Sequence, residues 1–466
     1  MENKLERKYG LFMAVCMVLG IVIGSGVFFK AQDILSYTGG NVLLGVLAWI
    51  IGGIIMIICS LVFANFATKY EKINGVVDYA EAIMGKKYAY IVGWFMATIY
   101  YPAMTGVLAW VSARYTLVLF GSSDITGGLC LALAAFYLVA IYALNNLSPK
   151  LSGKFHVSAT VIKMIPLGVM IVFGLIIGLI NGNTVEAFKT SISDMSNTGS
   201  IFRAIVAAAF AYEGWIIATS INSEIKNSKK NLPLALVIGS MIIMFVYVVY
   251  FIALTGGASS DSLITEGSTK AFVNLFGNAG AVLLNAFVVI SCLGTLNGLM
   301  IACSRGMYSI ALRSKSAKNE VLTQVDPLTN MPTNSGIVGL LFASFWLFYF
   351  YGANLQPKPI FGLFSFDSSE LPIVTVYLLY VPMFIKYIIR ERKGETKKNL
   401  ILTGLACAAS LFMVVCAVYA HGIVPFKNAQ ASGNFQFPIL FYLIMFIVIM
   451  SGSLFFNKDL LKKENK

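Results

Sequence analysis

The sequence predicts an all-α integral membrane protein with twelve transmembrane helices. Of its 466 residues, 58% are hydrophobic and only 12% are charged, whereas soluble domains carry about 25% charged residues. A membrane-spanning helix needs about 20 mainly apolar residues, and the sequence offers twelve such segments. Glycine and acidic residues interrupt two of them, which is unusual inside a span. The segments are residues 11–37, 41–66, 88–120, 126–145, 156–181, 200–221, 234–256, 271–304, 336–353, 370–390, 400–420 and 436–456.

The distribution of basic residues predicts the orientation of these helices. The net charge of +13 does not require a nucleic-acid partner, because lysine and arginine gather in the cytoplasmic loops of membrane proteins. If residues 1–10 are cytoplasmic, most of the 34 lysine and arginine residues fall on the cytoplasmic side. An even number of spans makes residues 457–466 cytoplasmic too. We therefore expect a multi-pass protein of the plasma membrane that contacts the lipid bilayer and binds no nucleic acid.

Other features exclude several classes of function. The seven cysteines lie in or at the ends of apolar segments, so no disulfide framework is visible. The two histidines, His156 and His421, show no metal-ligand spacing. The longest polar interval, residues 304–335, is expected to be a cytoplasmic loop and not an inserted domain. No nucleophile–base pair is expected at membrane depth, so we predict no cofactor, no metal and no enzymatic activity.

The first apolar segment contains an unusual stretch, residues 20–28, with the sequence Gly-Ile-Val-Ile-Gly-Ser-Gly-Val-Phe. Each glycine in a helix interior lowers stability by roughly 0.5–1 kcal/mol relative to alanine. Gly20 and Gly24 have the spacing that lets two membrane helices pack closely. Alternatively, the helix breaks here, which is tolerated only where the freed backbone groups face protein or a water-filled cavity. The stretch alone does not decide between these interpretations.

The sixth segment contains a matching interruption. Residues 207–215 read Ala-Ala-Ala-Phe-Ala-Tyr-Glu-Gly-Trp, so a carboxylate and a glycine stand inside an apolar span, five spans after the first interruption. Paired interruptions in two halves are typical of transporters built from inverted repeats. This favours a transporter built from two inverted repeats, in which helices 1 and 6 are discontinuous. The predicted repeats are residues 11–181 and 200–390, and residues 400–456 supply two extra helices.

The two breaks predict a binding site for a zwitterion. The outer half of helix 1 would begin near Gly24-Ser25-Gly26, where free N–H groups and a positive helix end suit a carboxylate. Free carbonyls at Ile21–Ile23 and Phe210–Tyr212 would suit an ammonium group. An amino acid carries both groups, so we expect an amino acid substrate. The predicted substrate-binding residues are Ile21, Val22, Gly24, Ser25, Gly26, Phe210, Ala211, Tyr212 and Glu213.

Lys163 and Glu213 are ionisable residues inside predicted spans, where charges usually face the bundle interior or water. The side chain of Lys163 could extend to the cytoplasmic interface. Alternatively, it stands as a fixed cation in place of a sodium ion near the break of helix 1, or takes part in proton coupling. Glu213 could satisfy free backbone N–H groups, carry a proton or pair with an ammonium. Phe210, beside the second break, is the best candidate for a gating side chain.

Together these residues resemble the amino acid–polyamine–organocation superfamily, specifically its L-type amino acid transporter family and the bacterial serine/threonine-type exchangers. Residues 20–28 and 210–215 resemble the family's motifs in spans 1 and 6. Lys163 matches its span-5 lysine, and residues 291–298 resemble its span 8. The likeness covers nearly the whole chain, more loosely after residue 318.

The resemblance implies the leucine-transporter fold and alternating access. It implies that the substrate carboxylate binds at Ser25 and Gly26, and that the amine binds carbonyls of helices 1 and 6. It also implies that Phe210 is the gate and that Lys163 links helix 5 to helix 1. Members of this family usually exchange neutral amino acids without sodium.

Two departures from the family pattern matter. Glu213 stands where many members have a small residue, which weakens the expectation of strict neutral specificity. Residues 121–125 lack the cysteine with which animal members bond a glycoprotein, so no disulfide-linked glycoprotein subunit is expected. We expect a sodium-independent exchanger of small neutral L-amino acids. The alternatives are a proton-coupled importer that uses Glu213 or Lys163, with cationic substrates included, and a sensor that binds amino acids without transporting them.

Overall fold

The structure is a computed structural model, and it is all-helical in the residues that it describes. These are residues 10–24, 26–69, 75–193, 200–218, 225–313, 319–395, 399–432 and 437–456, and no strand occurs among them. The predicted all-α class is therefore confirmed. The predicted cytoplasmic termini, residues 1–10 and 457–466, lie outside the described residues except for Gly10.

Ten stretches of helix in the described part of the chain are long and apolar enough to cross a membrane. Each lies on one of the predicted apolar segments. Four of them combine several elements: three contain a short π-helical turn, and one is interrupted at Lys163. The elements are α3 (Val42–Lys69); α5 (Lys86–Phe95), η1 (Met96–Tyr100) and α6 (Tyr101–Leu119); α7 (Gly128–Leu147); α8 (Pro149–Ile162) and α9 (Met164–Ile180); α13 (Ser228–Gly257); α15 (Ser268–Ala311); α17 (Thr333–Phe350) and η4 (Tyr351–Leu355); α18 (Leu371–Arg392); α19 (Leu400–Val418), η6 (Tyr419–Ile423) and α20 (Val424–Ser432); and α21 (Pro438–Phe456).

The first and sixth predicted segments are each divided into two shorter helices. The first comprises α1 (Leu11–Val22) and α2 (Gly26–Tyr37), and the sixth comprises α11 (Ile201–Tyr212) and α12 (Trp215–Ala218). These divided helices lie in the interior: α11 packs on α2 and α3, and α1 packs on α13. Every residue from 204 to 212 is buried, and most of them are alanine, which allows neighbouring helices to approach closely.

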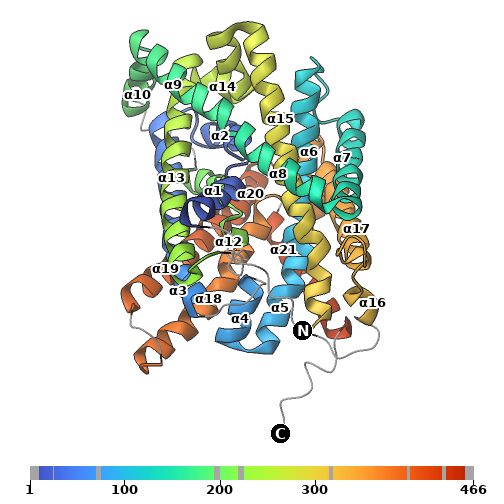
Figure 1. The fold of residues 1–466 in the computed structure, drawn as a ribbon. Helices are drawn as coiled ribbons and strands as arrows, with labels where there is room; N and C mark the ends of the chain where they lie inside the picture. The colour runs from blue at the N-terminus through green and yellow to red at the C-terminus, as the bar shows by residue number, and fades with distance from the viewer. Residues whose placement is uncertain are drawn as a thin grey trace.

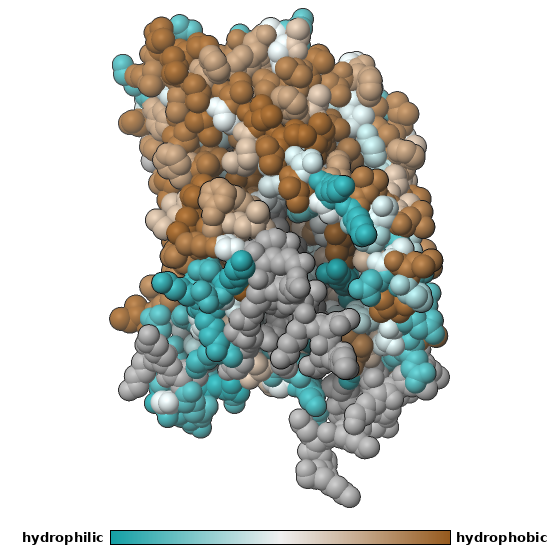
Figure 2. Space-filling view, viewed as in Figure 1, coloured by the Kyte–Doolittle hydropathy of each residue, from teal (hydrophilic) through white to brown (hydrophobic). Residues whose placement is uncertain are grey.

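Large apolar side chains cover much of the outer surface. Figure 2 shows them over most of the visible face, while hydrophilic side chains gather toward the end of the molecule at which α4 (Val76–Met84) lies. Exposed examples are Phe136, Phe245 and Ile447. Monomeric soluble proteins rarely expose apolar surface on this scale. The surface therefore suits contact with lipid.

Short helices mark the two ends of the bundle (Figure 1). The helices α10 (Asn183–Ser193) and α14 (Ser260–Glu266) lie at one end, which we call the outer end. The helices α4 and α16 (Glu320–Thr323) lie at the opposite, inner end. A short 3-10 helix, η5 (Gly362–Phe364), lies in the connection between η4 and α18.

The predicted loop at residues 304–335 is shorter than expected, because α15 continues to Ala311 and α17 begins at Thr333. Arg313, just beyond α15, explains the extension: its guanidinium pairs with Asp78 and Glu81 of α4. The remaining loop turns at Asp326, whose carboxylate accepts hydrogen bonds from the backbone N–H groups of Thr329 and Leu328. These bonds hold the pKa of the Asp326 carboxyl below its usual range.

Candidate functional site

The first helix ends where glycines and a serine interrupt its apolar sequence. Helix α1 ends at Val22, Ile23 has an extended backbone, and α2 begins at Gly26. Ser25, a predicted carboxylate ligand, lies outside the described residues, as does the side chain of Ile21. The break leaves carbonyls at the end of α1 without helical partners.

At the second break, as at the first, a residue with an extended backbone precedes a glycine. Helix α11 ends at Tyr212, and Glu213 is extended, with φ −68° and ψ 156°. Gly214 has φ 107°, a conformation that side-chain-bearing residues rarely adopt. Helix α12 then starts at Trp215. The Glu-Gly pair therefore ends one helix and redirects the chain.

The two breaks meet directly. A Cβ atom built on Gly26 would lie 2.6 Å from the Cα atom of Ala211, so α2 begins against the backbone of α11. The hydroxyl of Tyr247, on α13, lies 3.0 Å from the carbonyl oxygen of Val22 and 3.2 Å from that of Ala211. One hydroxyl proton is shared between these two acceptors. Tyr247 therefore joins the ends of both broken helices.

A cavity of about 220 Å³ lies beside the breaks. Six predicted binding residues line it: Val22, Gly24, Gly26, Phe210, Ala211 and Glu213. The other lining residues come from α1, η1, α6, α8, the break after α11 and α15, and they are mostly apolar. They are Met17, Gly20, Tyr100, Met104, Leu108, His156, Gly214, Thr295, Gly298, Leu299 and Ile301.

Tyr212 is a predicted binding residue that does not line this cavity. Its hydroxyl donates to the carbonyl oxygen of Trp49 at 2.9 Å, and its ring stacks on Tyr247 with centroids 5.1 Å apart. The side chain therefore packs between α3 and α13. Its backbone remains at the break.

Lys163 lies where α8 passes into α9, and its side chain is only 2% exposed. Its ammonium donates a hydrogen bond to the carbonyl oxygen of Gly20 on α1. This contact joins the fifth predicted span to the first and supplies a donor near the broken end of α1. The buried position does not fit the alternative in which the side chain extends to an interface.

Glu213 and Tyr100 form a polar pair on the cavity wall. The Tyr100 hydroxyl donates a hydrogen bond to the Glu213 carboxylate, and both residues line the cavity. Tyr100 belongs to the π-helical turn η1, and such turns often occur at functional sites. The Tyr100 hydroxyl therefore holds the carboxylate at the cavity wall.

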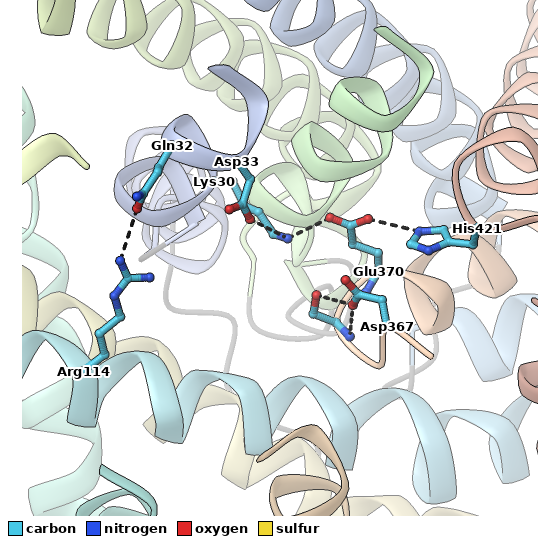
Figure 3. A network of polar contacts seen from close by, with 8 residues as sticks. Lys30, Gln32, Asp33, Arg114, Asp367, Glu370 and His421 are labelled. Carbon is cyan, nitrogen blue, oxygen red and sulfur yellow. Dashed lines mark hydrogen bonds and ion pairs between the residues drawn. The ribbon is translucent and has the colours of Figure 1, made fainter. Parts of the chain in front are cut away.

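The sequence did not reveal a second buried polar cluster above Phe210. Figure 3 shows Lys30 of α2 directed at Glu370, which in turn faces His421 of η6. Glu370 is the first residue of its predicted span, and Lys30 lies in the outer half of residues 11–37, so the sequence places both toward the outer side without indicating that they meet. The signal that could have found them is their opposite charge in two outer segments.

Comparison with known proteins identifies the family of the chain. Residues 9–450 match the sequence pattern of the amino acid permease family. The chain belongs to this family. It is part of the amino acid–polyamine–organocation superfamily, so the predicted resemblance is confirmed.

Several relatives of this permease have known activities. It is 30% identical to the serine/threonine exchanger SteT of Bacillus subtilis (strain 168), over 89% of this chain and 91% of that protein. It is 26% identical to the human cystine/glutamate transporter, over 90% and 81% of the two chains. It is 24% identical to the mouse b(0,+)-type amino acid transporter 1, over 97% and 88%. These relatives are membrane permeases and transporters, not enzymes.

Proposed function

We propose that this permease exchanges small neutral L-amino acids across the plasma membrane by alternating access, without sodium. The observation that carries the proposal is the meeting of two broken helices at one cavity of about 220 Å³. Pockets for drug-sized ligands measure about 300–1,000 Å³, so this volume favours a small solute. The exchange activity of the Bacillus subtilis relative supports the mode of transport.

The amino acid would bind with its carboxylate at the start of α2 and its ammonium near the carbonyls that end α1 and α11. Gly24 and Gly26 would present backbone N–H groups together with Ser25, and the helix end adds a favourable dipole. Val22 and Ala211 would contribute their carbonyls, in competition with the Tyr247 hydroxyl. Phe210 would close over the substrate.

The ten long helices and the two divided ones would give twelve spans. In this proposal, residues 11–181 and 200–390 are inverted repeats, and residues 400–456 add two helices. Both termini are cytoplasmic, because that orientation places most basic residues inside. The inner end of the bundle then faces the cytoplasm. No disulfide-linked subunit is required.

Proton-coupled import is the second candidate function, and the position of Glu213 favours it. A carboxylate on the cavity wall, hydrogen-bonded to Tyr100, could carry a proton or pair with a cationic substrate. Lys163 is the other candidate for a proton carrier.

Counterflow in liposomes distinguishes the two functions. Vesicles containing the purified protein and unlabelled L-serine are expected to accumulate external radiolabelled L-serine, equally with and without sodium. Empty vesicles are expected to take up little. Uptake into empty vesicles driven by a pH gradient alone would instead establish proton coupling, and an absence of flux in both assays would overturn the proposed transport.

Glu213→Gln is expected to leave L-serine counterflow within about fivefold of the unsubstituted rate, because a neutral acceptor for Tyr100 changes the free energy by about 1 kcal/mol. The pH dependence of counterflow should also stay unchanged. Tyr100→Phe, which removes the donor, serves as the matched variant. If a pH gradient alone drives L-serine uptake by the unsubstituted protein and Glu213→Gln abolishes that uptake, Glu213 carries the proton and the exchange proposal fails.

A further inference from the structure

A chain of buried charges joins α2 to the start of α18 and to η6 (Figure 3). The Nζ atom of Lys30 lies 2.8 Å from Oε1 of Glu370, and Oε2 of Glu370 lies 3.1 Å from Nε2 of His421. The Lys30 and Glu370 side chains are both 2% exposed. Asp33, on the next turn of α2, adds a carboxylate oxygen 3.2 Å from Lys30 Nζ. Three segments that are far apart in sequence thus meet at one ion pair.

Glu370 is held in position independently of Lys30. The Oδ1 atom of Asp367 accepts hydrogen bonds from the backbone N–H groups of Ser369 at 2.7 Å and Glu370 at 3.0 Å. This turn fixes the backbone just before α18, and His421 occupies the second carboxylate oxygen. The other carboxylate oxygen, Oε1, is therefore directed at α2 and accepts a hydrogen bond from Lys30. The ion pair between α2 and the start of α18 depends on the position of Lys30.

Lys30 also contacts two aromatic side chains, one of which lines the cavity. Its Nζ atom lies 5.0 Å from the ring centre of Phe29 and 5.2 Å from that of Phe210. Phe29 and Phe210 pack edge to face, with centroids 5.8 Å apart, and Phe210 lines the cavity. A cation over an aromatic face attracts more strongly when both are desolvated. The charge cluster and the candidate gating side chain therefore form one packed unit.

The cavity and this unit lie on opposite sides of Phe210. The cavity is lined by Met17 of α1, His156 of α8 and Ile301 of α15. Helix α15 runs from α14 at the outer end to α16 at the inner end (Figure 1), and Ile301 lies in its inner half. On the outer side, Gln32 of α2 donates to the carbonyl oxygen of Ile264 in α14. An amino acid could reach the cavity from the outer end only if α2 and Phe210 moved away from α18.

A buried ion pair suits a closure that must reopen. The cost of removing two charges from water largely offsets their attraction, so such a pair adds little net stability. Water that enters when the helices separate weakens the attraction between the two charges further. We propose that Lys30, Glu370 and His421 form an outer latch that closes the outer end while the cavity faces inward. The inference rests on the proposed function. Lys30 and Glu370 are positioning residues, since neither lines the cavity.

Transport kinetics at the two membrane faces test the latch. Lys30→Met and Glu370→Gln remove a bond that exists only in the outwardly closed state, so both variants should favour the outward-facing state. For L-serine counterflow, the KM at the outer face is expected to fall while the KM at the inner face rises. The ratio of outer to inner KM should fall by about tenfold, because apparent affinity follows the population of the competent state. Vesicles of each orientation give the two values.

Several variants separate the latch from general damage. Lys30→Arg, which keeps the cation, should leave the ratio close to that of the unsubstituted protein. The double variant Lys30→Met/Glu370→Gln should shift the ratio no further than either single variant, because both remove the same ion pair. His421→Leu should shift it in the same direction as Lys30→Met, whereas His421→Gln, which keeps a donor, should shift it less. Lys270→Met is the control, because Lys270 forms an exposed ion pair with Glu266 near the outer end.

The outcomes distinguish failure of the latch from failure of the proposed function. If the unsubstituted protein exchanges L-serine and the single variants move both KM values in the same direction, or neither, the latch is refuted. The same conclusion follows if His421→Leu behaves as the unsubstituted protein and the effects of Lys30→Met and Glu370→Gln simply add in the double variant, since two residues of one pair should not act additively. If the unsubstituted protein shows no counterflow, the proposed function itself is wrong.

Discussion

Gly26→Leu is expected to abolish amino acid binding in a protein that still inserts into the membrane. At this position a Cβ atom would lie 2.6 Å from the Cα atom of Ala211, and neither backbone can turn aside as a flexible side chain could. Overpacking a well-packed site typically costs about 1–3 kcal/mol. Here the strain is relieved only if α2 and α11 separate. The N–H groups proposed to bind the carboxylate would then move away from the carbonyls proposed to bind the ammonium.

Thermal unfolding with each of the twenty amino acids measures this effect, because a ligand that binds the folded state raises its apparent stability. The unsubstituted protein should be stabilised by L-serine or a similar small amino acid, and Gly26→Leu should lose at least about tenfold in affinity. Gly168→Leu is the matched control, since a Cβ atom built on Gly168 of α9 would meet no other atom within 4 Å. A Gly26→Leu protein with unchanged L-serine affinity would refute the carboxylate site.

The division of the first and sixth segments could be anticipated because glycine and a carboxylate have a known effect inside a membrane helix. Gly214 takes a positive φ, and Glu213 gains a position on the cavity wall from the extended backbone that ends α11. Both properties are local, so they follow from residue type and spacing. Lys163 could be anticipated for a related reason: a charge in an apolar span needs a partner, and the freed carbonyl of Gly20 provides one.

The contacts that the sequence did not reveal depend on distant packing. Lys30 and Glu370 are 340 residues apart, and the sequence places both in the outer part of their spans without indicating that they meet. Tyr247 reaches both breaks from the middle of α13, where an aromatic residue in an apolar helix carries no particular signal. Tyr100 faces Glu213 from the π-helical turn η1. A π-helical turn contains one residue more than an α-helical turn, so it changes which side chains share a face of the helix. Periodicity predicts which residues form a helix but not which buried polar groups meet.

Lys163→Ala is expected to slow exchange mainly at the inner face of the membrane. The ammonium is buried and donates to Gly20 of α1, but Lys163 does not line the cavity. Leaving a buried acceptor unsatisfied costs about 1–3 kcal/mol, and this penalty falls on the state in which α8 and α1 are joined. We expect the maximal rate of L-serine exchange from the inner face to fall by about tenfold.

The affinity for L-serine should change much less, because the groups proposed to bind the amino acid remain in place. Lys154→Ala is the matched control, since Lys154 lies on α8, the helix that ends just before Lys163, and is exposed. Counterflow in vesicles of both orientations, with KM and maximal rate separated, provides the measurement. Equal rates for Lys163→Ala and the unsubstituted protein at both faces would show that the bond to Gly20 has no part in the transport cycle. A loss confined to L-serine affinity would instead assign Lys163 to the binding site, because a residue that only joins α8 to α1 should act on the rate.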